Sequence, residues 1–398
     1  MGLYLGSDPG DPIALVLYAD TGAGHRRAAE AVVEVLADSS PTPFRAVLLD
    51  PLTGPLAARP LQLIARLYGP AVRWAPWVWG AAYHISNSRL AMAVLWRTVF
   101  RFANQVVAAQ VEATRPSVIV SCHPLTGRAA VLAARQTGSA PIRTVTVVTD
   151  LADMHTSWRY PLADSLTVSC AEAFAAALAR GVPASRCQET GLPVGASAQA
   201  PPAPAARGAL RRSLGLPERD FVVLLGGGGE GCGGLARRTA AIVRKLPDVH
   251  VVTCCGRNSR LIQRLTPVAR RAGGRLTVLG FVDNFTDWLR CADIVVTKAG
   301  PGIIAEAACC GTPLLLSSHV PGQERGNAAL VSEAGAGSRA RGTRRMLREL
   351  ARLRDNPAEL AARRAGCRKL ARPDAAEQVA RLVAWQTLPR HRDSVSPR

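Results

Sequence analysis

The chain has 398 residues, 48% of them hydrophobic and 20% charged, which is enough apolar surface for one large or two medium packed domains and excludes a disordered or collagen-like chain. Its 49 basic and 29 acidic side chains give a formal net charge of +20, which calls for an anionic partner such as nucleic acid, a nucleotide or a phospholipid surface. The ten cysteines lack the spacing of a zinc site, and the N-terminal segment has acids where a signal peptide has arginines, so we expect a reduced, cytosolic protein.

Short runs rich in Val, Ile and Leu recur with helix-like stretches between them, the pattern of parallel strands covered on both faces by crossover helices. The predicted strands of the first half cover residues 13–18, 44–49, 118–121, 143–148 and 165–168. Those of the second half cover residues 221–225, 249–254, 276–279, 294–297 and 313–316. We therefore predict an α/β fold with two doubly wound domains, which bind ligands beyond the carboxyl ends of their strands.

An Ala/Pro-rich stretch separates the two sets of strands and is predicted to sustain neither a helix nor a central strand. The predicted organisation is a first domain over 1–198 with an insertion at about 55–110, a linker over 199–217, a second domain over 218–372, and a C-terminal helix and tail over 373–398. We expect this last segment to pack back on the first domain.

The insertion combines arginines with aromatic side chains. Residues 51–110 include no acid but six arginines and four tryptophans. Indole rings at headgroup depth and guanidinium groups facing anionic lipid are typical of a segment that lies on a bilayer, and its longest uncharged piece is too short to cross one. The residues predicted to face the membrane are Arg73, Trp74, Trp77, Trp79 and Trp96. The alternative is that these aromatic rings form ordinary core under a long connection.

Two glycine-rich loops follow predicted strands. In the first half, TGAGH places Gly24 and His25 at a helix start, where exposed amides favour negative charge; taken alone, a surface histidine explains this loop equally well. In the second half, the loop at 226–231 repeats the arrangement without the Lys-Ser/Thr ending of a P-loop, so it is a phosphate-loop candidate without a named nucleotide.

The segment 292–337 is the most informative. A strand ends at Thr297, Lys298 follows, and a helix begins near Pro301, where the missing amide costs nothing. The first turn of that helix can hold a diphosphate through its amides and dipole. Glu306 falls on the early turns of the helix, where a carboxylate can accept two hydrogen bonds from a vicinal diol such as ribose.

Ten motifs occur in the order and approximate spacing of the monogalactosyldiacylglycerol synthase family, which groups with the processive diacylglycerol glucosyltransferases and the muramyl-peptide N-acetylglucosaminyltransferase. They are TGAGH (21–25), CHPL (122–125), VVTDL (147–151), GLPV (191–194), GGGEG (227–231), CGRN (255–258), GFV (280–282), TKAGPG (297–302), AEA (305–307) and PGQERGNA (321–328). The chain resembles this family over nearly all of residues 13–337. The resemblance implies a GT-B glycosyltransferase with two Rossmann-like domains, the second holding a UDP-sugar and the first a lipid acceptor, which inverts the anomeric carbon without a bound metal or other cofactor.

The resemblance also implies roles for individual residues. His25 matches the histidine that the family uses as general base, and Asp150 is expected either to orient His25 or the acceptor, or to be a buried structural acid. The residues that the resemblance places at the donor are Gly229, Gly231, Arg257, Asn258, Phe281, Val282, Lys298, Gly300, Pro301, Gly302, Glu306, Gln323, Glu324 and Asn327. Among these, the resemblance places Phe281 and Val282 at the uracil and the amides of Gly229, Gly231 and Gly302 near the diphosphate. It places Gln323, Glu324 and Asn327 at the sugar and the neighbouring phosphate. The residues placed at the acceptor are Gly24, His123, His155 and Trp158.

The chain departs from the family pattern at two positions. Ala23 replaces a glycine of the usual TGGGH loop, and Thr156 stands where proline is common, between His155 and Trp158. The residue at position 23 affects how closely the backbone can approach the acceptor. The residue at position 156 affects which acceptor is preferred.

The resulting hypothesis is a UDP-hexose:diacylglycerol glycosyltransferase that makes a glycosyldiacylglycerol at the inner face of the cell membrane, peripherally attached on the cytoplasmic side. A second hypothesis changes the acceptor to a polyprenyl-linked or secondary-metabolite aglycone. A third is a basic nucleic-acid-binding protein, but the sequence holds no recognisable nucleic-acid module, so we expect no nucleic-acid partner. The choice between glucose, galactose and another hexose, the number of sugars added and the number of subunits stay open.

Overall fold

The computed structural model describes residues 4–5, 10–20, 23–38, 43–63, 75–136, 142–158, 163–231, 233–320, 322, 324 and 326–387. Three residues named above, Arg73, Trp74 and Gln323, lie outside the described residues.

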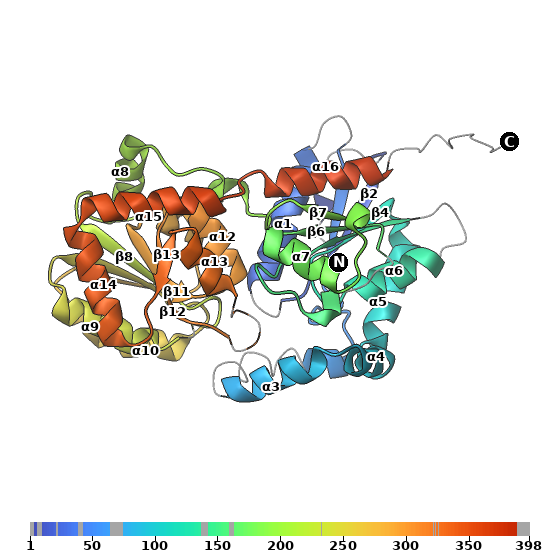
Figure 1. Ribbon diagram of the computed structural model, residues 1–398, viewed down its shortest axis with the longest axis horizontal. Helices are drawn as coiled ribbons and strands as arrows, with labels where there is room; N and C mark the ends of the chain where they lie inside the picture. The colour runs from blue at the N-terminus through green and yellow to red at the C-terminus, as the bar shows by residue number, and fades with distance from the viewer. Residues whose placement is uncertain are drawn as a thin grey trace.

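The chain forms two α/β domains that lie side by side (Figure 1). The first sheet has the strand order β1-β3-β2-β4-β5-β6-β7 and is parallel except for β1, which pairs antiparallel with β3. Its strands are β1 (Tyr4–Leu5), β2 (Ile13–Leu17), β3 (Arg45–Leu49), β4 (Val118–Ser121), β5 (Arg143–Val147), β6 (Ser165–Val168) and β7 (Cys187–Glu189). The predicted two-domain α/β architecture is confirmed.

The second sheet is parallel throughout, with the order β10-β9-β8-β11-β12-β13. Its strands are β8 (Phe221–Gly226), β9 (Val249–Cys254), β10 (Leu276–Leu279), β11 (Ile294–Lys298), β12 (Leu314–Ser318) and β13 (Gly337–Arg339). The central strands are apolar because helices cover both faces of the sheet: all six residues of β9 are buried. The strands that the sequence patterns missed, β1, β7 and β13, are two or three residues long.

Helices surround both sheets. Those of the first domain are α1 (Ala23–Asp38), α3 (Pro76–Ser86), α4 (Arg89–Thr98), α5 (Arg101–Thr114), α6 (Gly127–Gln136) and α7 (Ala171–Ala179), with short 3-10 turns η1 (Thr156–Trp158), η2 (Ala184–Arg186) and η3 (Ala196–Ala198). Those that follow are α8 (Pro204–Ser213), α9 (Leu235–Lys245), α10 (Ser259–Arg271), α11 (Phe285–Cys291), α12 (Pro301–Cys309), α13 (Asn327–Glu333), α14 (Thr343–Asp355), α15 (Pro357–Leu370) and α16 (Ala375–Thr387).

The linker contains a helix, contrary to the prediction from its Ala/Pro-rich composition. Helix α8 begins with Pro204 in its first turn, where the fixed φ of proline suits a helix and its missing amide costs nothing. Two arginines of α8, Arg207 and Arg211, donate to the carboxylate of Asp293 at 2.7 and 2.8 Å. The helix is therefore held by ion pairs to the start of β11 that composition alone does not reveal.

The C-terminal helix α16 leaves the second domain and packs on the first. Figure 1 shows α15 and α16 following one another along one side of the molecule, across both domains. Val379, Ala380 and Val383 of α16 are buried in the same core as residues of α1, β2 and β4, and Gln386 donates to Ser165 Oγ at 2.6 Å. The chain thus crosses between the domains at 199–217 and again before α16.

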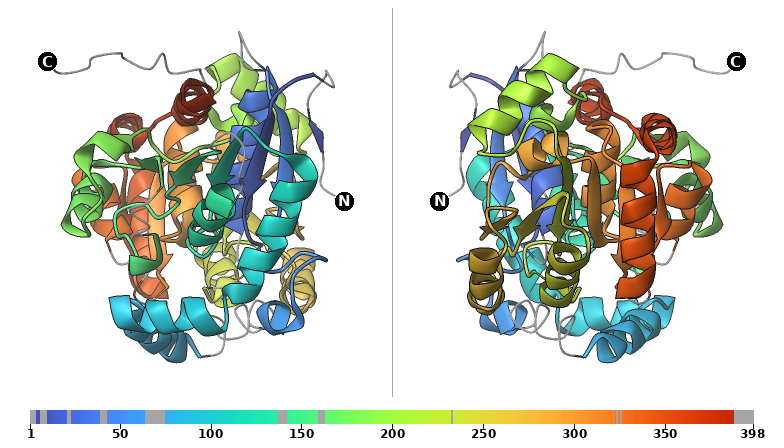
Figure 2. Two further views of the ribbon diagram at one scale, coloured as in Figure 1. Left: turned by 90° about the vertical axis from the view of Figure 1, so that its right-hand side faces the viewer. Right: turned by 90° about the vertical axis from the view of Figure 1, so that its left-hand side faces the viewer.

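The insertion forms helices on the opposite side of the molecule from α16. In Figures 1 and 2, α3 and α4 lie below the two domains, away from both sheets. No helix among the described residues is long and apolar enough to cross a bilayer.

Candidate functional site

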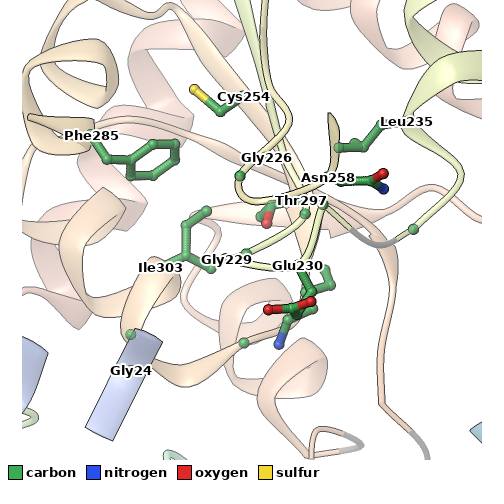
Figure 3. Close-up of a pocket in the computed structure, with 18 of the residues that line it drawn as sticks. Gly24, Gly226, Gly229, Glu230, Leu235, Cys254, Asn258, Phe285, Thr297 and Ile303 are labelled. Carbon is green, nitrogen blue, oxygen red and sulfur yellow. The ribbon is translucent and has the colours of Figure 1, made fainter. Parts of the chain in front are cut away.

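A cleft of about 1060 Å³ lies between the two domains at the carboxyl ends of their strands. The first domain contributes the start of α1 and the residues that follow β5; the second contributes the loops after β8, β9, β10, β11 and β12. Figure 3 shows the N-terminal end of α1 at Gly24 close to α12 at Ile303, with Gly229 and Glu230 nearby. The predicted residues Gly24, His25, Asp150, Gly229, Gly231 and Lys298 line this single cavity.

His25 lies in the first turn of α1 and faces the cleft. Its Nδ1 lies 2.6 Å from Thr149 Oγ1. Burial lowers the pKa of His25 to about 4; a hydrogen bond to the Cys122 carbonyl opposes this shift and the charge of Lys298 adds to it. The imidazole is therefore neutral at physiological pH, the form that can accept a proton.

Buried aromatic side chains pack against His25 on the side away from the cleft. The ring of His123 meets that of His25 edge-on with centroids 4.5 Å apart, and the ring of Trp158 lies 6.3 Å away. The indole of Trp158 donates to Asp150 Oδ2 at 2.7 Å. Of the predicted acceptor residues, His123 and Trp158 are thus buried behind the histidine, and Gly24 borders the cleft.

The loop after β8 is shaped by close backbone contacts. Gly231 has a φ of +58°, and a Cβ at this position would lie 2.2 Å from the Cys255 carbonyl oxygen, so only glycine fits. Its amide donates to Gly228 O at 3.0 Å, and the amide of Arg257 donates to Gly229 O at 2.8 Å. The Gly231 amide, expected near a diphosphate, is therefore engaged within the loop.

The turn at 300–302 places the start of α12 against the start of α1. Gly300 is the N-cap and Pro301 the first helical residue, as predicted, so the first-turn amides that follow have no acceptor within the helix. An added Cβ on Gly302 would lie 3.5 Å from the Cα of Gly24. The two helix starts therefore meet across the cleft, and an anion bound between them would face both sets of amides.

Lys298 and Glu324 form an ion pair in the floor of the cleft. The other carboxylate oxygen of Glu324 accepts the amide of Val320 at 2.8 Å, and Glu324 is buried. In this arrangement the carboxylate that the resemblance places at the donor also orients Lys298, whose Nζ would lie 2.9 Å from a Cβ on Gly300.

Glu306 lies on α12 and is 7% exposed. Arg27 of α1 donates from Nη1 to both of its carboxylate oxygens, at 2.9 and 3.0 Å. None of the sequence motifs pointed to Arg27. The only available signal was its place two residues after His25, because its partner lies 279 residues further along the chain.

The uracil end of the predicted site is open to solvent. Phe281 is 47% exposed, Val282 lines the cleft beside it, and the Arg257 guanidinium lies 4.9 Å from the Phe281 ring centroid. Arg257 also lies 3.5 Å from Asp20 of the first domain. Asn258 caps α10 by accepting the Leu261 amide at 3.1 Å, so its side-chain oxygen has a structural task.

The loop that leads into α13 is held by the first domain. Asp153 Oδ2 accepts the amide of Gly326 at 2.8 Å, and Asn327 Oδ1 accepts that of Ala152 at 3.1 Å. Asn327, which is fully buried, also donates to Ala299 O at 2.9 Å. Asn327 thus ties the segment after β5 to the 300–302 turn, a positioning task distinct from direct contact with a sugar.

His155 joins the insertion to this loop system. Its ring contacts that of Tyr83 of α3 at a tilt of 53°, with ring centroids 4.6 Å apart, and its Nε2 lies 3.3 Å from Ser86 Oγ. Thr156, which replaces the common proline, donates its amide to Asn87 Oδ1 at 2.8 Å. Proline has no amide hydrogen, so this contact depends on the departure from the family pattern.

The predicted membrane residues divide into exposed and buried ones. Trp77 is 75% exposed, whereas Trp96 is 7% exposed and packs on Phe100 with ring centroids 5.2 Å apart. Trp79 is only partly exposed. The prediction that Trp96 faces a membrane is therefore wrong, because the inner face of α4 turns this ring into the core. The exposed large apolar side chains of the insertion are instead Leu56, Leu63, Trp77, Val78, Ile85, Leu90 and Val94.

No group of three or more His, Cys, Asp or Glu side chains with the geometry of a metal site occurs among the described residues. That the reaction needs no metal stays a prediction.

Comparison with known proteins agrees with this architecture. The model of the family described as monogalactosyldiacylglycerol synthase matches residues 25–194, and that of the glycosyltransferase family 28 C-terminal domain matches residues 222–379. A probable monogalactosyldiacylglycerol synthase of Nicotiana tabacum is 31% identical over 91% of this chain and 68% of its own length. Monogalactosyldiacylglycerol synthase 1 of Arabidopsis thaliana is 30% identical over 81% of this chain and 61% of its own length.

Solved structures share the fold at low sequence identity. MurG of Acinetobacter baumannii has a TM-score of 0.58 at 17% identity, covering 94% of this chain and 99% of its own. S. aureus MnaA, solved with UDP, has a TM-score of 0.61 at 12% identity, covering 97% of this chain and all of its own. HepE of Anabaena in complex with UDP has a TM-score of 0.58 at 14% identity, covering 94% of this chain and all of its own.

Proposed function

The chain belongs to the monogalactosyldiacylglycerol synthase family, and we propose that it transfers a hexose, in the first instance galactose, from a UDP-sugar to the free hydroxyl of diacylglycerol. The observation that carries the proposal is the meeting of two helix starts across one cleft: α1 brings a neutral histidine, and α12 brings free amides beside a lysine. The names of the curated relatives support galactose and diacylglycerol as the substrates.

The donor is expected to lie along the second domain. Its diphosphate would accept hydrogen bonds from the first-turn amides of α12 and would form an ion pair with Lys298. One helical turn further along α12, the Glu306 carboxylate would accept hydrogen bonds from the two ribose hydroxyls. The exposed ring of Phe281 would stack on uracil. All of these groups line the cleft.

The reaction would be a single displacement with inversion. His25 removes the proton from the acceptor hydroxyl as that oxygen forms a bond to the anomeric carbon; the bond from this carbon to the β-phosphate oxygen breaks, and UDP leaves with the electron pair. Approach from the first domain and departure toward the second place attacking and leaving oxygens on opposite sides of the sugar. The arriving diphosphate offsets the charge of Lys298, which weakens one of the influences that lower the pKa of His25.

The lipid acceptor would reach the cleft from a membrane surface under α3 and α4. Seven of the ten large apolar side chains that are most exposed among the described residues lie in the insertion. Arg89 and Arg97 are exposed on α4, and Arg101 is exposed at the start of α5. Apolar side chains that enter the headgroup layer beside arginines that meet lipid phosphates would hold the protein at an anionic bilayer. Attachment at the inner face of the cell membrane is part of this proposal.

The direct test is incubation with a panel of UDP-sugars and diacylglycerol in mixed vesicles, followed by mass spectrometry and NMR of the lipid product. We expect a monohexosyldiacylglycerol with the β configuration, formed fastest from UDP-galactose. A product that retains the α configuration would contradict the single displacement. Transfer to a polyprenyl phosphate or an aglycone in preference to diacylglycerol would contradict the acceptor.

A further inference from the structure

Arg27 and Glu306 connect the two helices that form the site. Arg27 lies two residues after His25 on α1, and Glu306 lies four residues after Gly302 on α12. One nitrogen of Arg27, Nη1, lies 2.9 and 3.0 Å from the two carboxylate oxygens of Glu306. The ion pair therefore spans the domains about one turn behind the point where the helix starts meet.

The glutamate end of the ion pair is buried, and the arginine end is partly exposed. The Glu306 side chain is 9% exposed and that of Arg27 is 31% exposed. Arg27 is the only hydrogen-bond partner of the Glu306 carboxylate within the described part of the chain. The guanidinium carbon of Arg27 also lies 5.7 Å from the centroid of the Phe285 ring, which limits the positions that the arginine can take. Because buried carboxylates need such partners, the position of the Glu306 carboxylate depends on Arg27.

The ion pair leaves room for a ligand on the carboxylate. An ionised carboxyl group offers about four acceptor positions, and a single nitrogen between its oxygens uses only one side. Glu306 and Arg27 both line the cleft, so the remaining positions of the carboxylate can accept hydroxyl groups from it. An arginine that points the carboxylate at the cleft fixes where a vicinal diol binds.

The same contact fixes the spacing between the two helices. The start of α1 lies so close to that of α12 that a Cβ on Gly302 would be 3.5 Å from the Gly24 Cα. Moving α1 along its axis would break the ion pair and displace His25 at the same time, since Arg27 and His25 both lie on the first two turns of this helix. The ion pair thus links the position of the Glu306 carboxylate, where the ribose would bind, to the position of the His25 imidazole.

We infer that Arg27 is a positioning residue: it aims the Glu306 carboxylate at the ribose hydroxyls of the donor and holds the helix of the general base in register with the bond that is broken. This inference rests on the proposed function, since it requires a UDP-sugar in the cleft. It adds a residue from the acceptor-binding domain to the recognition of the nucleotide.

The test compares UDP with 2′-deoxy-UDP by calorimetry on the full chain. In the wild-type protein we expect the deoxy compound to bind about tenfold more weakly, because a hydrogen bond to a charged group is lost. In Arg27→Ala we expect UDP to bind about tenfold more weakly than to wild type, and the difference between UDP and 2′-deoxy-UDP to fall to about twofold, because a misplaced carboxylate no longer reads the hydroxyl. Arg27→Lys should recover part of the difference.

The matched control is Arg26→Ala on the same helix. Arg26 is nearly half exposed, does not line the cleft, and pairs with Glu30 of the same helix and, at 3.9 Å, with Asp20, so we expect wild-type affinity for both ligands. Should Arg27→Ala fail to fold by circular dichroism, Arg27→Gln keeps the packing over Phe285 and is predicted to lose the same discrimination.

The outcomes separate the inference from the function on which it rests. A discrimination against 2′-deoxy-UDP that is as large in the folded Arg27 variants as in wild type would overturn the role of Arg27, as would wild-type protein that binds both ligands equally. Wild-type protein that binds neither ligand would instead reject the proposed function.

Discussion

The Nδ1 atom of His25 lies 2.6 Å from the Oγ1 atom of Thr149, across the gap between the start of α1 and the end of β5. The carboxylate of the next residue, Asp150, accepts instead from the indole of Trp158. A hydroxyl group orients the imidazole without placing a negative charge on it, and a charge of that kind would raise its pKa. This is consistent with a pKa near 4 for His25 and with a histidine that stays neutral until the acceptor arrives.

Thr149→Val removes the hydroxyl group and keeps the shape of the side chain. We predict that kcat falls about tenfold, because the lost hydrogen bond allows the ring to turn away from the acceptor. Thr149→Ser, which retains the hydroxyl group, should stay within about twofold of wild type, since the contact atom is preserved. Steady-state transfer to diacylglycerol at saturating donor measures both variants, and equal rates for the valine and serine variants would reject Thr149 as the orienting residue.

The dependence of kcat/KM on pH reports the ionisation of the free enzyme. A base must be unprotonated, so activity is lost as the pH falls through its pKa in the folded protein. Because burial lowers the pKa of His25 to about 4, we predict a flat profile from pH 8 to about pH 5.5 and a decline centred near pH 4. The profile is measured over the pH range in which circular dichroism shows folded protein. A decline centred near 6.5 would mean that the base is a solvated histidine.

Membrane binding is predicted to depend on the exposed face of α3. Trp77→Ser combined with Ile85→Ser should weaken binding to anionic vesicles at least tenfold, because each side chain loses about 1.5 to 3 kcal/mol of apolar transfer free energy. Activity on detergent-dispersed diacylglycerol should change less than twofold. Trp385→Ser is the matched control, since Trp385 is 57% exposed on α16, on the opposite side of the molecule. Equal losses of vesicle binding in the two proteins would contradict a membrane face at α3.

Stability should depend on pH through His155. Burial lowers its pKa from 6.5 to about 4, partly opposed by its hydrogen bond to the Tyr83 carbonyl, so the unfolded chain binds the extra proton between these values. The neutral His155 therefore contributes to the free energy of unfolding. This contribution is fully present above pH 6.5 and is lost as the pH falls toward 4, and the loss between pH 7.5 and pH 5 is about 2 kcal/mol. We therefore predict that His155→Gln loses less stability over this interval than wild type, by about that amount. Urea unfolding at both pH values measures the difference, and parallel losses in the two proteins would exclude His155 as the source.

The sequence was sufficient for the features that depend on neighbouring residues. Apolar runs of four to six residues predicted the central strands, since such runs must be covered on both faces, and Pro301 beside Gly300 predicted the start of α12. The helix α8 was missed because its stability comes from arginines that reach Asp293, more than 80 residues further along the chain.

Contacts between the domains could not be predicted from one sequence. Arg27 and Glu306 are separated by 279 residues, and Asp153 and Gly326 by 173, so no local pattern links them. The exposure of individual tryptophans could not be predicted either. Trp77 of α3 and Trp96 of α4 both lie in a basic segment rich in aromatic residues, and their exposure depends on which face of each helix packs on the core.

The proposed function requires that the cleft between α1 and α12 bind the diphosphate of UDP opposite His25. Titration calorimetry of UDP into wild-type protein and into His25→Ala tests it most directly, alongside transfer assays on the same samples. We predict one UDP site with similar affinity in both proteins, and transfer that is nearly abolished in His25→Ala. Absence of heat from UDP in the folded wild-type protein, or unchanged transfer by His25→Ala, would contradict it.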